Sequence, residues 1–588
     1  MKNSDESLKS GFTQPVAYEF ADLRLDLRRH ALERNGQALP SSPRMLEALA
    51  MLLEHPGELI MKQDLMQRLW PNVIVEDNSL ARVMSDLRKA LGDSAECIVT
   101  VARRGYRFDG RVEPIYRRAD TIASARRVLA VLPFAPFTPH EDDRSLAFGI
   151  ADALTTRLSR IQEVIVRPTS STARYSNGAK PAAEAGRELK ADVILCGSLR
   201  RAGTQLRVSV QLIEVEAEAT LWADQFDEAL SDLFAIEDSI SRRVAEALAL
   251  ELSGAQRSSL TRRHTGNPEA YDLYLRGRFL LSRRTGQALR GAADLFARAC
   301  ELDPSFALAF AGIAEAKVLA TIPSATLDAA PPKEMVPTAR EAALRALSLD
   351  ANLSEAHAVL GQIAFTYDWD RNGAESAFRR AIEINPHSTT ARQFYAMALA
   401  CLGQQSEAIA EMKRILEIDP TWVVARANLG IILARSGRLN EALHELSSCA
   451  AVEPTSAYLH FRYGLVLQSA GRFDDALEQF VAMMSVAGAE IQSMAAQAHL
   501  LATIGRIEEA RALLNRLKEL STQRYVSAFF LAEVHLGLAE VDLALDWLER
   551  AYEERSVLMI SLQVNEKLAP LRSHPRFVAL VRRVGMWP

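Results

Sequence analysis

The sequence has few cysteines and no long apolar segment. Its five cysteines, at positions 97, 196, 300, 401 and 449, are scattered and form no Cys-x-x-Cys pair. That pattern argues against a disulfide framework or a zinc site and fits a reducing compartment. The apolar run at residues 128–134 is far shorter than the ~20 residues that a membrane helix needs, and the first residues lack the apolar core of a signal peptide. We therefore expect a cytoplasmic protein with no membrane helix.

Catalytic motifs are also lacking. The sequence contains no Gly-x-x-x-x-Gly-Lys-Ser/Thr phosphate loop. His444 and Glu445 begin like a zinc-protease helix, but Ser448 stands where the second histidine is required. The sequence therefore predicts no catalytic residue, no metal site, no cofactor and no enzymatic activity.

A helix beside a basic hairpin is predicted between residues 78 and 108. Apolar residues recur at helical spacing and Gly92 is a typical helix stop, while Arg104 and Gly105 lie where two short strands turn. Residues 78–107 carry six Lys or Arg against three Asp or Glu, whereas the whole chain has a net charge of -5. A local basic patch on an acidic chain suits a specific DNA binder better than a general polyanion binder.

The segments upstream of this helix complete a recognisable order. Residues 18–39 alternate like short strands with a turn at Asn35-Gly36, and helices are predicted at 43–54 and 62–70. This order resembles the C-terminal DNA-binding domain of OmpR/PhoB-type response regulators, and most closely the CadC/HilA-like group, where the domain is N-terminal. The matching phrases are LLEHPGELIMKQDLMQRLWP, NSLARVMSDLRKALGD and IVTVARRGYRF.

The resemblance implies that the helix enters the major groove and that the hairpin reaches the flanking backbone or minor groove. Arg and Lys would contact guanine edges or phosphates, Ser79 a phosphate, and Trp70 the backbone. Neutral or acidic residues at Val83, Ser85 and Asp86 depart from the family's frequent basic or His residues, so the docking mode carries over and the DNA sequence preference does not. The predicted DNA contacts are Trp70, Asn78, Ser79, Arg82, Arg88, Lys89, Arg103 and Arg104.

A second strong pattern is an internal repeat of 34 residues. Alanines at 374, 408, 442, 476, 510 and 544 keep this period, and so do glycines at 403, 437, 471 and 505. The unit resembles the tetratricopeptide repeat, and about eight units are expected from residue 270 to about 556. A loop insertion is predicted at 322–337 and a closing helix pair at 558–588. The resemblance implies a superhelix whose concave face binds a partner protein, a small effector or another copy of the chain.

The sequence pattern in the middle of the chain predicts an α/β domain. The predicted order over residues 126–252 is βαβαβββα, with a mixed sheet. It resembles the TolB-N-terminal-like domain in the phrases VLAVLPF, GIADALTTRLSRI, ADVILCGSLRR and LWADQFDEALSDLFAIEDSIS. Two interpretations stay open: a pocket near Pro133, Ser170 or Gly197, or a packing and relay module.

Together these features predict a multidomain chain that is α+β first and all-α afterwards. The expected parts are a disordered N-terminus (1–15), a winged-helix DNA-binding domain (16–110), a linker (111–125), a TolB-like α/β domain (126–252), a second linker (253–268), and a tetratricopeptide array with capping helices (269–588).

The predicted function is regulation of transcription. The winged helix would read double-stranded promoter DNA under the control of the array, without a receiver domain, and activation through RNA polymerase is favoured by family analogy. A protein or small-molecule effector would bind the array, and homo-oligomers would bind tandem half-sites. A scaffold whose winged helix serves protein contacts and a signalling enzyme are the alternatives.

Overall fold

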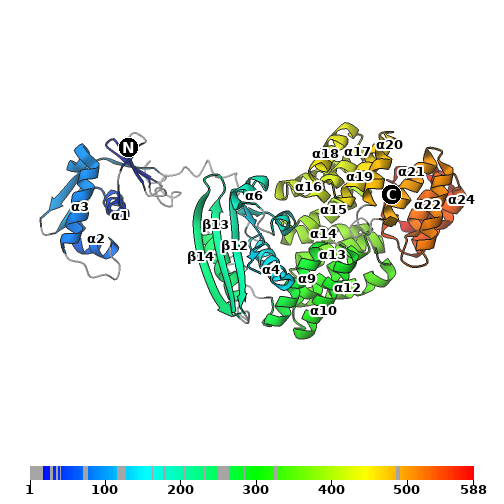
Figure 1. Cartoon of the computed structure of the whole chain (residues 1–588), viewed down its shortest axis with the longest axis horizontal. Helices are drawn as coiled ribbons and strands as arrows, with labels where there is room; N and C mark the ends of the chain where they lie inside the picture. The colour runs from blue at the N-terminus through cyan, green and yellow to red at the C-terminus, as the bar shows by residue number, and fades with distance from the viewer. Residues whose placement is uncertain are drawn as a thin grey trace, which may run out of the picture. The chain divides into compact units, whose positions relative to one another are not determined.

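The computed structural model divides the chain into two compact units, Met1–Ala125 and Arg126–Pro588 (Figure 1). The residues that the structure describes are 17–26, 31–34, 37–39, 41–69, 77–102, 104–115, 127–138, 140–159, 161, 163–176, 180–202, 205–229, 233–248, 264–283, 285–323, 329–484 and 490–587.

The first unit is a winged helix built on two antiparallel sheets. One sheet has the order β4-β3-β2-β1-β8, and the other has the order β5-β7-β6. Strand β8 lies in the segment that the sequence assigns to a linker, and it pairs with β1. The strands are β1 (Ala17–Phe20), β2 (Leu23–Asp26), β3 (Ala31–Arg34), β4 (Gln37–Ala38), β5 (Ile60–Met61), β6 (Ile98–Val101), β7 (Gly105–Phe108) and β8 (Val112–Ile115).

Three helices and a 3-10 turn pack between these sheets. Helix α3 presents Leu80, Met84 and Leu87 to the core, all essentially buried, as its apolar spacing predicts. Burying each of these side chains contributes about 2 kcal/mol. Gly105 allows β7 to approach β5 closely where the two strands pair, because a Cβ there would lie 1.9 Å from the Ile60 carbonyl oxygen. The helices are α1 (Pro43–Glu54), α2 (Lys62–Leu69), α3 (Asp77–Leu91) and η1 (Gly92–Cys97).

The second unit begins with the predicted mixed sheet, whose main order is β11-β9-β12-β13-β14. Strands β11, β9 and β12 run parallel, and β12, β13 and β14 form an antiparallel meander. The strands are β9 (Arg127–Val131), β10 (Ala135–Pro136), β11 (Val164–Val166), β12 (Val193–Ala202), β13 (Gln205–Glu214) and β14 (Ala219–Ala229). The helices are α4 (Glu141–Leu158), α5 (Thr169–Thr172), η3 (Ala173–Tyr175), α6 (Ala182–Glu188) and α7 (Leu233–Ala247).

The array consists of eight antiparallel helix pairs within the described residues, which agrees with the expected number of repeats. The pairs are α9 (Pro268–Arg283) with α10 (Gly286–Leu302), α11 (Ala307–Ala320) with α12 (Pro332–Leu349), α13 (Ser354–Ile363) with α14 (Arg371–Ile384), α15 (Thr389–Cys401) with α16 (Gln405–Ile418), α17 (Val423–Arg435) with α18 (Leu439–Val452), α19 (Ala457–Ser469) with α20 (Phe473–Met483), α21 (Glu490–Thr503) with α22 (Ile507–Leu520), and α23 (Ala528–Gly537) with α24 (Val541–Glu553). A π-helical turn, η5 (Ala364–Asp368), extends α13.

Small residues set the distance between the helices of a pair. A Cβ on Gly430 would lie 2.6 Å from Leu446 Cγ, and one on Gly464 would lie 2.4 Å from Phe480 Cε1. The large partner fills the space that the missing Cβ leaves, so a small residue faces a large one at each of these two crossings.

The predictions for two segments of the array were wrong. Helix α12 already begins at Pro332 and contains Pro337, so the insertion before it is shorter than expected. The lost backbone hydrogen bond at Pro337 is offset by burial of Val336 and Ala339 beside it. The tail forms two 3-10 helices and one α-helix rather than a helix pair: η6 (Val557–Ser561), η7 (Glu566–Leu571) and α25 (Pro575–Val584).

The α/β domain and the array share one hydrophobic core. Helix α4 lies against the sheet and also against α9 (Figure 1). A Cβ on Gly149 of α4 would lie 2.5 Å from Leu275 Cβ of α9, so these two helices approach closely. Leu154 and Tyr271 belong to a single buried cluster that continues into the first repeats. Among the described residues, the structure has no helix long and apolar enough to cross a membrane.

Candidate nucleic-acid interface

The solvent-facing side of α3 is polar and partly cationic. Arg82, Ser85, Asp86 and Lys89 are exposed, while the opposite side of the helix is buried. Lys89 Nζ lies 3.8 Å from Asp86 Oδ1, and both side chains stay largely in water. Such an exposed ion pair stabilises a protein by ~1 kcal/mol or less. Lys89 can therefore leave Asp86 and contact a phosphate or a base instead.

Arg88 holds α3 against the hairpin. Its Nη2 donates to the Ile98 carbonyl oxygen at 2.9 Å and to Thr100 Oγ1 at 2.7 Å, and its guanidinium lies 5.8 Å from the centre of the Tyr106 ring. Sequence reasoning placed this residue among the DNA contacts. The structure shows that one face of the guanidinium is already used to fix strand β6 relative to the helix.

The turn of the hairpin carries exposed positive charge on an anchored backbone. Arg104 is exposed, its N–H donates to the Val101 carbonyl at 3.0 Å, and its own carbonyl accepts from the Lys62 N–H at 3.0 Å. The turn is therefore tied to the start of α2. Tyr106 and Phe108 are buried under the hairpin rather than exposed to a ligand.

Arg107 is neutralised inside the hairpin. It forms a bidentate pair with Asp109, in which both hydrogen bonds measure 2.5 Å. The hydrogen bond to this guanidinium lowers the pKa of Asp109, and the pair raises that of Arg107. Arg107 therefore adds little to the positive charge that the hairpin offers to a ligand.

Of the four remaining predicted contacts, two lie at the start of α3 and two lie outside the described residues. Asn78 lies in the first turn of α3, and Ser79 follows it, half-buried. The amino end of a helix is a favourable place for a phosphate. Trp70 and Arg103 lie outside the described residues, so their predicted roles stay predictions.

Comparison with known families decides what kind of winged helix this is. Residues 36–108 match the family described as "Transcriptional regulatory protein, C terminal", and residues 125–243 match "HilA/YgeH-like transcriptional regulator, second domain". The chain carries an OmpR/PhoB-type winged helix followed by a HilA-like second domain. The predicted resemblance to the CadC/HilA-like group is confirmed.

Individual relatives extend this result. The chain is 23% identical over 381 residues to "Transcriptional regulator HilA" of Salmonella typhimurium, covering 64% of this chain and 66% of that protein. It is 34% identical over 81 residues to "Transcriptional activator CadC" of Escherichia coli, covering 13% and 16%. It is 30% identical over 189 residues to "Putative adenylate cyclase 3" of Rhizobium meliloti, covering 32% of each protein. The match spans less than two thirds of each of these relatives.

A polar interface that sequence reasoning missed joins the HilA-like domain to the array. Its centre is Arg167, which follows β11 and is only 4% exposed. Its Nε and Nη2 donate to the carbonyls of Leu189 and Lys190, both at 2.8 Å, within the α/β domain. Its Nη1 donates to the carbonyls of Glu417 and Ile418, both at 2.6 Å, at the end of α16. One guanidinium therefore bonds both domains at once.

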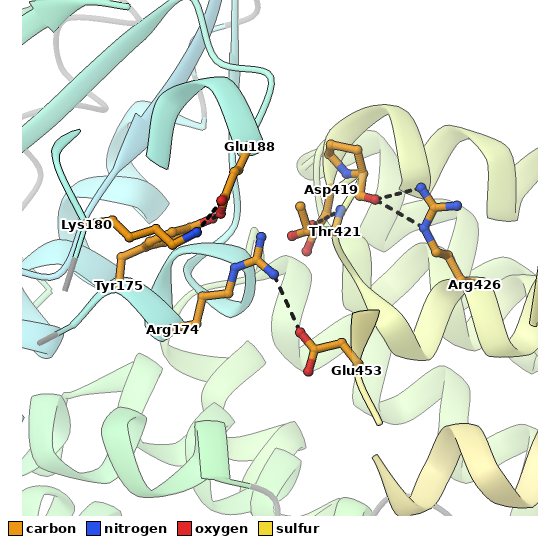
Figure 2. A network of polar contacts seen from close by, with 9 residues as sticks. Arg174, Tyr175, Lys180, Glu188, Asp419, Thr421, Arg426 and Glu453 are labelled. Carbon is orange, nitrogen blue, oxygen red and sulfur yellow. Dashed lines mark hydrogen bonds and ion pairs between the residues drawn. The ribbon is translucent and has the colours of Figure 1, made fainter. Parts of the chain in front are cut away.

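Figure 2 shows further polar contacts of this interface, around Asp419 and Arg174. Ser170 Oγ donates to Asp419 Oδ2 at 3.3 Å, and burial raises the pKa of this carboxyl although Thr421 and the serine hydroxyls donate to it. Arg174 reaches across to Glu453 of the array at 3.5 Å, but both side chains are about a third exposed. The interface thus has a buried centre at Arg167 and a wet rim at Arg174.

A second buried polar cluster joins α4, α7 and α9. Glu237 is fully buried and accepts a hydrogen bond from Tyr271 Oη at 2.8 Å. It also forms an ion pair with Arg157 Nη2 at 3.0 Å, and the other guanidinium nitrogen of Arg157 bonds Asp238. Burial raises the pKa of Glu237 to about 7 although Arg157 and Tyr271 favour its charged form.

The three residues expected near one pocket of the α/β domain line two separate cavities. Pro133 and Gly197 line one open depression, whereas Ser170 lines a different cavity together with array residues such as Trp422. Among the described residues, no group of histidine, cysteine and carboxylate side chains could hold a metal ion.

Proposed function

We propose that this chain is a sequence-specific DNA-binding regulator of transcription. The observation that carries the proposal is the cationic surface formed by Arg82 and Lys89 on α3 with Arg104 at the hairpin turn, on a winged helix of the transcriptional-regulator type. Within the described part of the chain, neither Arg82 nor Arg104 pairs with a carboxylate. Their charges are therefore free to neutralise phosphates or to bond base edges.

The geometry of α3 supports contact between its exposed side and DNA. Arg82 and Lys89 are seven residues apart, which corresponds to ~10.5 Å along a helix and to about three base-pair steps of DNA. In this proposal Arg82 and Lys89 contact base edges or phosphates. Ser79 and Asn78 contact a phosphate at the start of the helix. Arg88 fixes the hairpin, while the free edge of its guanidinium contacts the DNA backbone. Trp70 and Arg103 complete the proposed set.

The other parts of the chain would control this contact. We retain 16–110, 126–252 and 269–588 as the functional parts, and we add β8 (Val112–Ile115) to the first of them because it pairs with β1. Because the HilA-like domain and the array share a core and the Arg167 contact, an effector or partner protein bound to the array would act on both together. RNA polymerase and a second copy of the chain are further proposed partners. We also propose that the chain regulates and does not catalyse, so it should not turn over ATP to cyclic AMP.

The test begins with in vitro selection of double-stranded DNA by the full chain. Binding of the selected site is then measured by fluorescence anisotropy across a salt series for the wild type, Arg82→Ala and Lys89→Ala. Each lost phosphate contact should reduce the slope of log K against log salt by about 0.9, and each lost base contact should weaken binding by roughly 1–3 kcal/mol.

The matched control is Arg24→Ala on β2. Arg24 is also exposed, and it pairs with Glu19 at 3.6 Å, so its removal should leave binding unchanged. Failure to select any motif, or equal binding by the Arg82→Ala, Lys89→Ala and control variants, would reject DNA reading by this face. It would favour the scaffold alternative.

A further inference from the structure

The array encloses a cavity that the proposed DNA contact does not use. It has a volume of about 330 Å³, within the usual range for small-molecule sites. Helices α11, α13, α15, α17 and α19 contribute to its wall, and η6 from the C-terminal tail closes one side. Most of the wall is apolar, formed by side chains such as Phe394, Met397 and Leu558. A ligand of matching shape would therefore need an apolar body.

Two arginines also line this cavity, Arg435 from the end of α17 and Arg462 from α19. Among the described residues, neither guanidinium lies within ion-pair distance of a carboxylate. Arg462 donates to Tyr458 Oη at 3.0 Å and stacks on that ring, but its buried Nε has no hydrogen-bond partner in the part of the chain that the structure describes. Burial lowers the pKa of Arg435 and the nearby charge of Arg462 lowers it further, although the Cys401 side chain and the charge of Glu566 oppose these effects. Two like charges in an apolar cavity are costly unless an anion joins them.

A third group supports the presence of a ligand. Gln393 lines the same cavity, is only 9% exposed, and has an amide oxygen without a hydrogen-bond partner among the described residues. Buried polar atoms in folded proteins are nearly always bonded, so an exception needs an explanation. A bound molecule that carries a hydroxyl or N–H group would supply the donor that this oxygen lacks.

We propose that this cavity binds a small organic carboxylate with an apolar body. The planar forks of Arg435 and Arg462 match a carboxylate, and charge-assisted bonds of this kind are the strong ones. The apolar wall would hold the body of the ligand, and a hydroxyl or N–H group on that body would donate to the Gln393 amide oxygen. A phosphate is less suitable, because its additional charge and oxygens would face mainly apolar side chains.

Binding would also hold the tail of the chain. Val557, Leu558 and Ile560 of η6 form part of the cavity wall, and Trp587 Nε1 beyond them donates to the Cys401 carbonyl at 3.0 Å. A ligand that contacts both η6 and the arginines would bond the tail to the inner helices. A role for the ligand as effector rests on the proposed function, whereas its binding is tested without DNA.

The experiment measures binding of phenylacetate and octanoate to the full chain by calorimetry at millimolar ligand. The neutral alcohols 2-phenylethanol and 1-octanol and inorganic phosphate serve as comparison ligands. We expect saturable binding of at least one acid and at least ~10-fold weaker binding in Arg435→Met and Arg462→Met, since each removes a charge-assisted hydrogen bond. Arg438→Met is the matched control, because Arg438 is exposed and pairs with Glu441 outside the cavity.

Several outcomes would overturn the proposal. These are no saturable binding of either acid, equal binding of the matching alcohol, binding of phosphate alone, or unchanged binding in both arginine variants. The lysine variants Arg435→Lys and Arg462→Lys distinguish loss of binding from a folding defect, because they retain the positive charge and lose only the planar guanidinium. Intermediate affinity in these variants, with an unchanged circular dichroism spectrum, is the expected result. Loss of DNA binding in the separate test would leave this result standing.

Discussion

The interface at Arg167 allows a quantitative prediction for the substitution Arg167→Met. Methionine keeps much of the apolar stem but removes all four hydrogen bonds to the carbonyls of the two domains. Leaving a buried carbonyl without a donor costs about 1–3 kcal/mol. Part of that cost is offset because a charged guanidinium no longer has to be buried, as the lowered pKa of Arg167 indicates. We expect the contact between the α/β domain and the array to weaken by about 3 kcal/mol.

Native-state hydrogen exchange of the full chain measures this loss at the interface itself. The reporters are the amides of Asp419 and Trp422, which donate to Ile415 and Asp419 in the turn that Arg167 holds. A loss of 3 kcal/mol corresponds to roughly 100-fold faster exchange if the interface opens before global unfolding. Amides deep in the array, such as those of α22, should keep their protection.

The control is Arg174→Ala at the rim of the same interface. Its pair with Glu453 is about a third exposed on both sides, so solvent screening limits its contribution to ~1 kcal/mol or less. If Arg167→Met accelerates exchange no more than Arg174→Ala does, the carbonyl bonds of Arg167 do not hold the domains together and the reasoning fails.

Three further predictions concern other parts of the chain. Arg88→Ala should destabilise the winged helix by about 1 kcal/mol, as urea unfolding would show, and should reduce the salt slope of DNA binding by about 0.9 through the lost backbone contact; an unchanged free energy of unfolding would contradict the bracing role. Because burial raises the pKa of Glu237 to about 7, the folded state binds its proton more tightly than the unfolded state, so this stabilisation is fully present below about pH 4.5 and is lost as the pH rises through 7. Wild-type stability should therefore fall by about 2 kcal/mol more than that of Glu237→Gln between pH 5.5 and 7.5, and parallel pH profiles in urea unfolding would disprove it. Gly430→Ala should cost about 1–3 kcal/mol through overpacking against Leu446, and an unchanged melting temperature would show that the helices can separate freely.

The fold was largely predictable because its signals are local. The 34-residue period placed the helix pairs, and the glycine that ends a first helix, as at Gly437, has the positive φ of +82° that such a stop requires. The apolar spacing of α3 likewise predicted its buried face. Strand β8 escaped prediction because β1, its partner among the described residues, lies more than ninety residues earlier in the chain.

The polar sites could be predicted only in part. Exposed cations such as Arg82 are visible in the sequence, because a family resemblance assigns their position. The bracing contacts of Arg88 depend on where β6 lies, and the bonds of Arg167 reach 250 residues along the chain. The pairing of Arg435 with Arg462 depends on how two repeats stack. No short sequence window contains both partners of such contacts.

The shared core of α4 and α9 has a consequence for how the second unit unfolds. Since Gly149 and Leu275 are in direct contact, the first repeat supplies part of the hydrophobic support for the sheet. A fragment cut between residues 253 and 268 would expose the side of α4 that α9 covers, so the HilA-like domain and the first repeats should unfold in one cooperative step. The boundary between two sequence families is therefore not a boundary between two folding units.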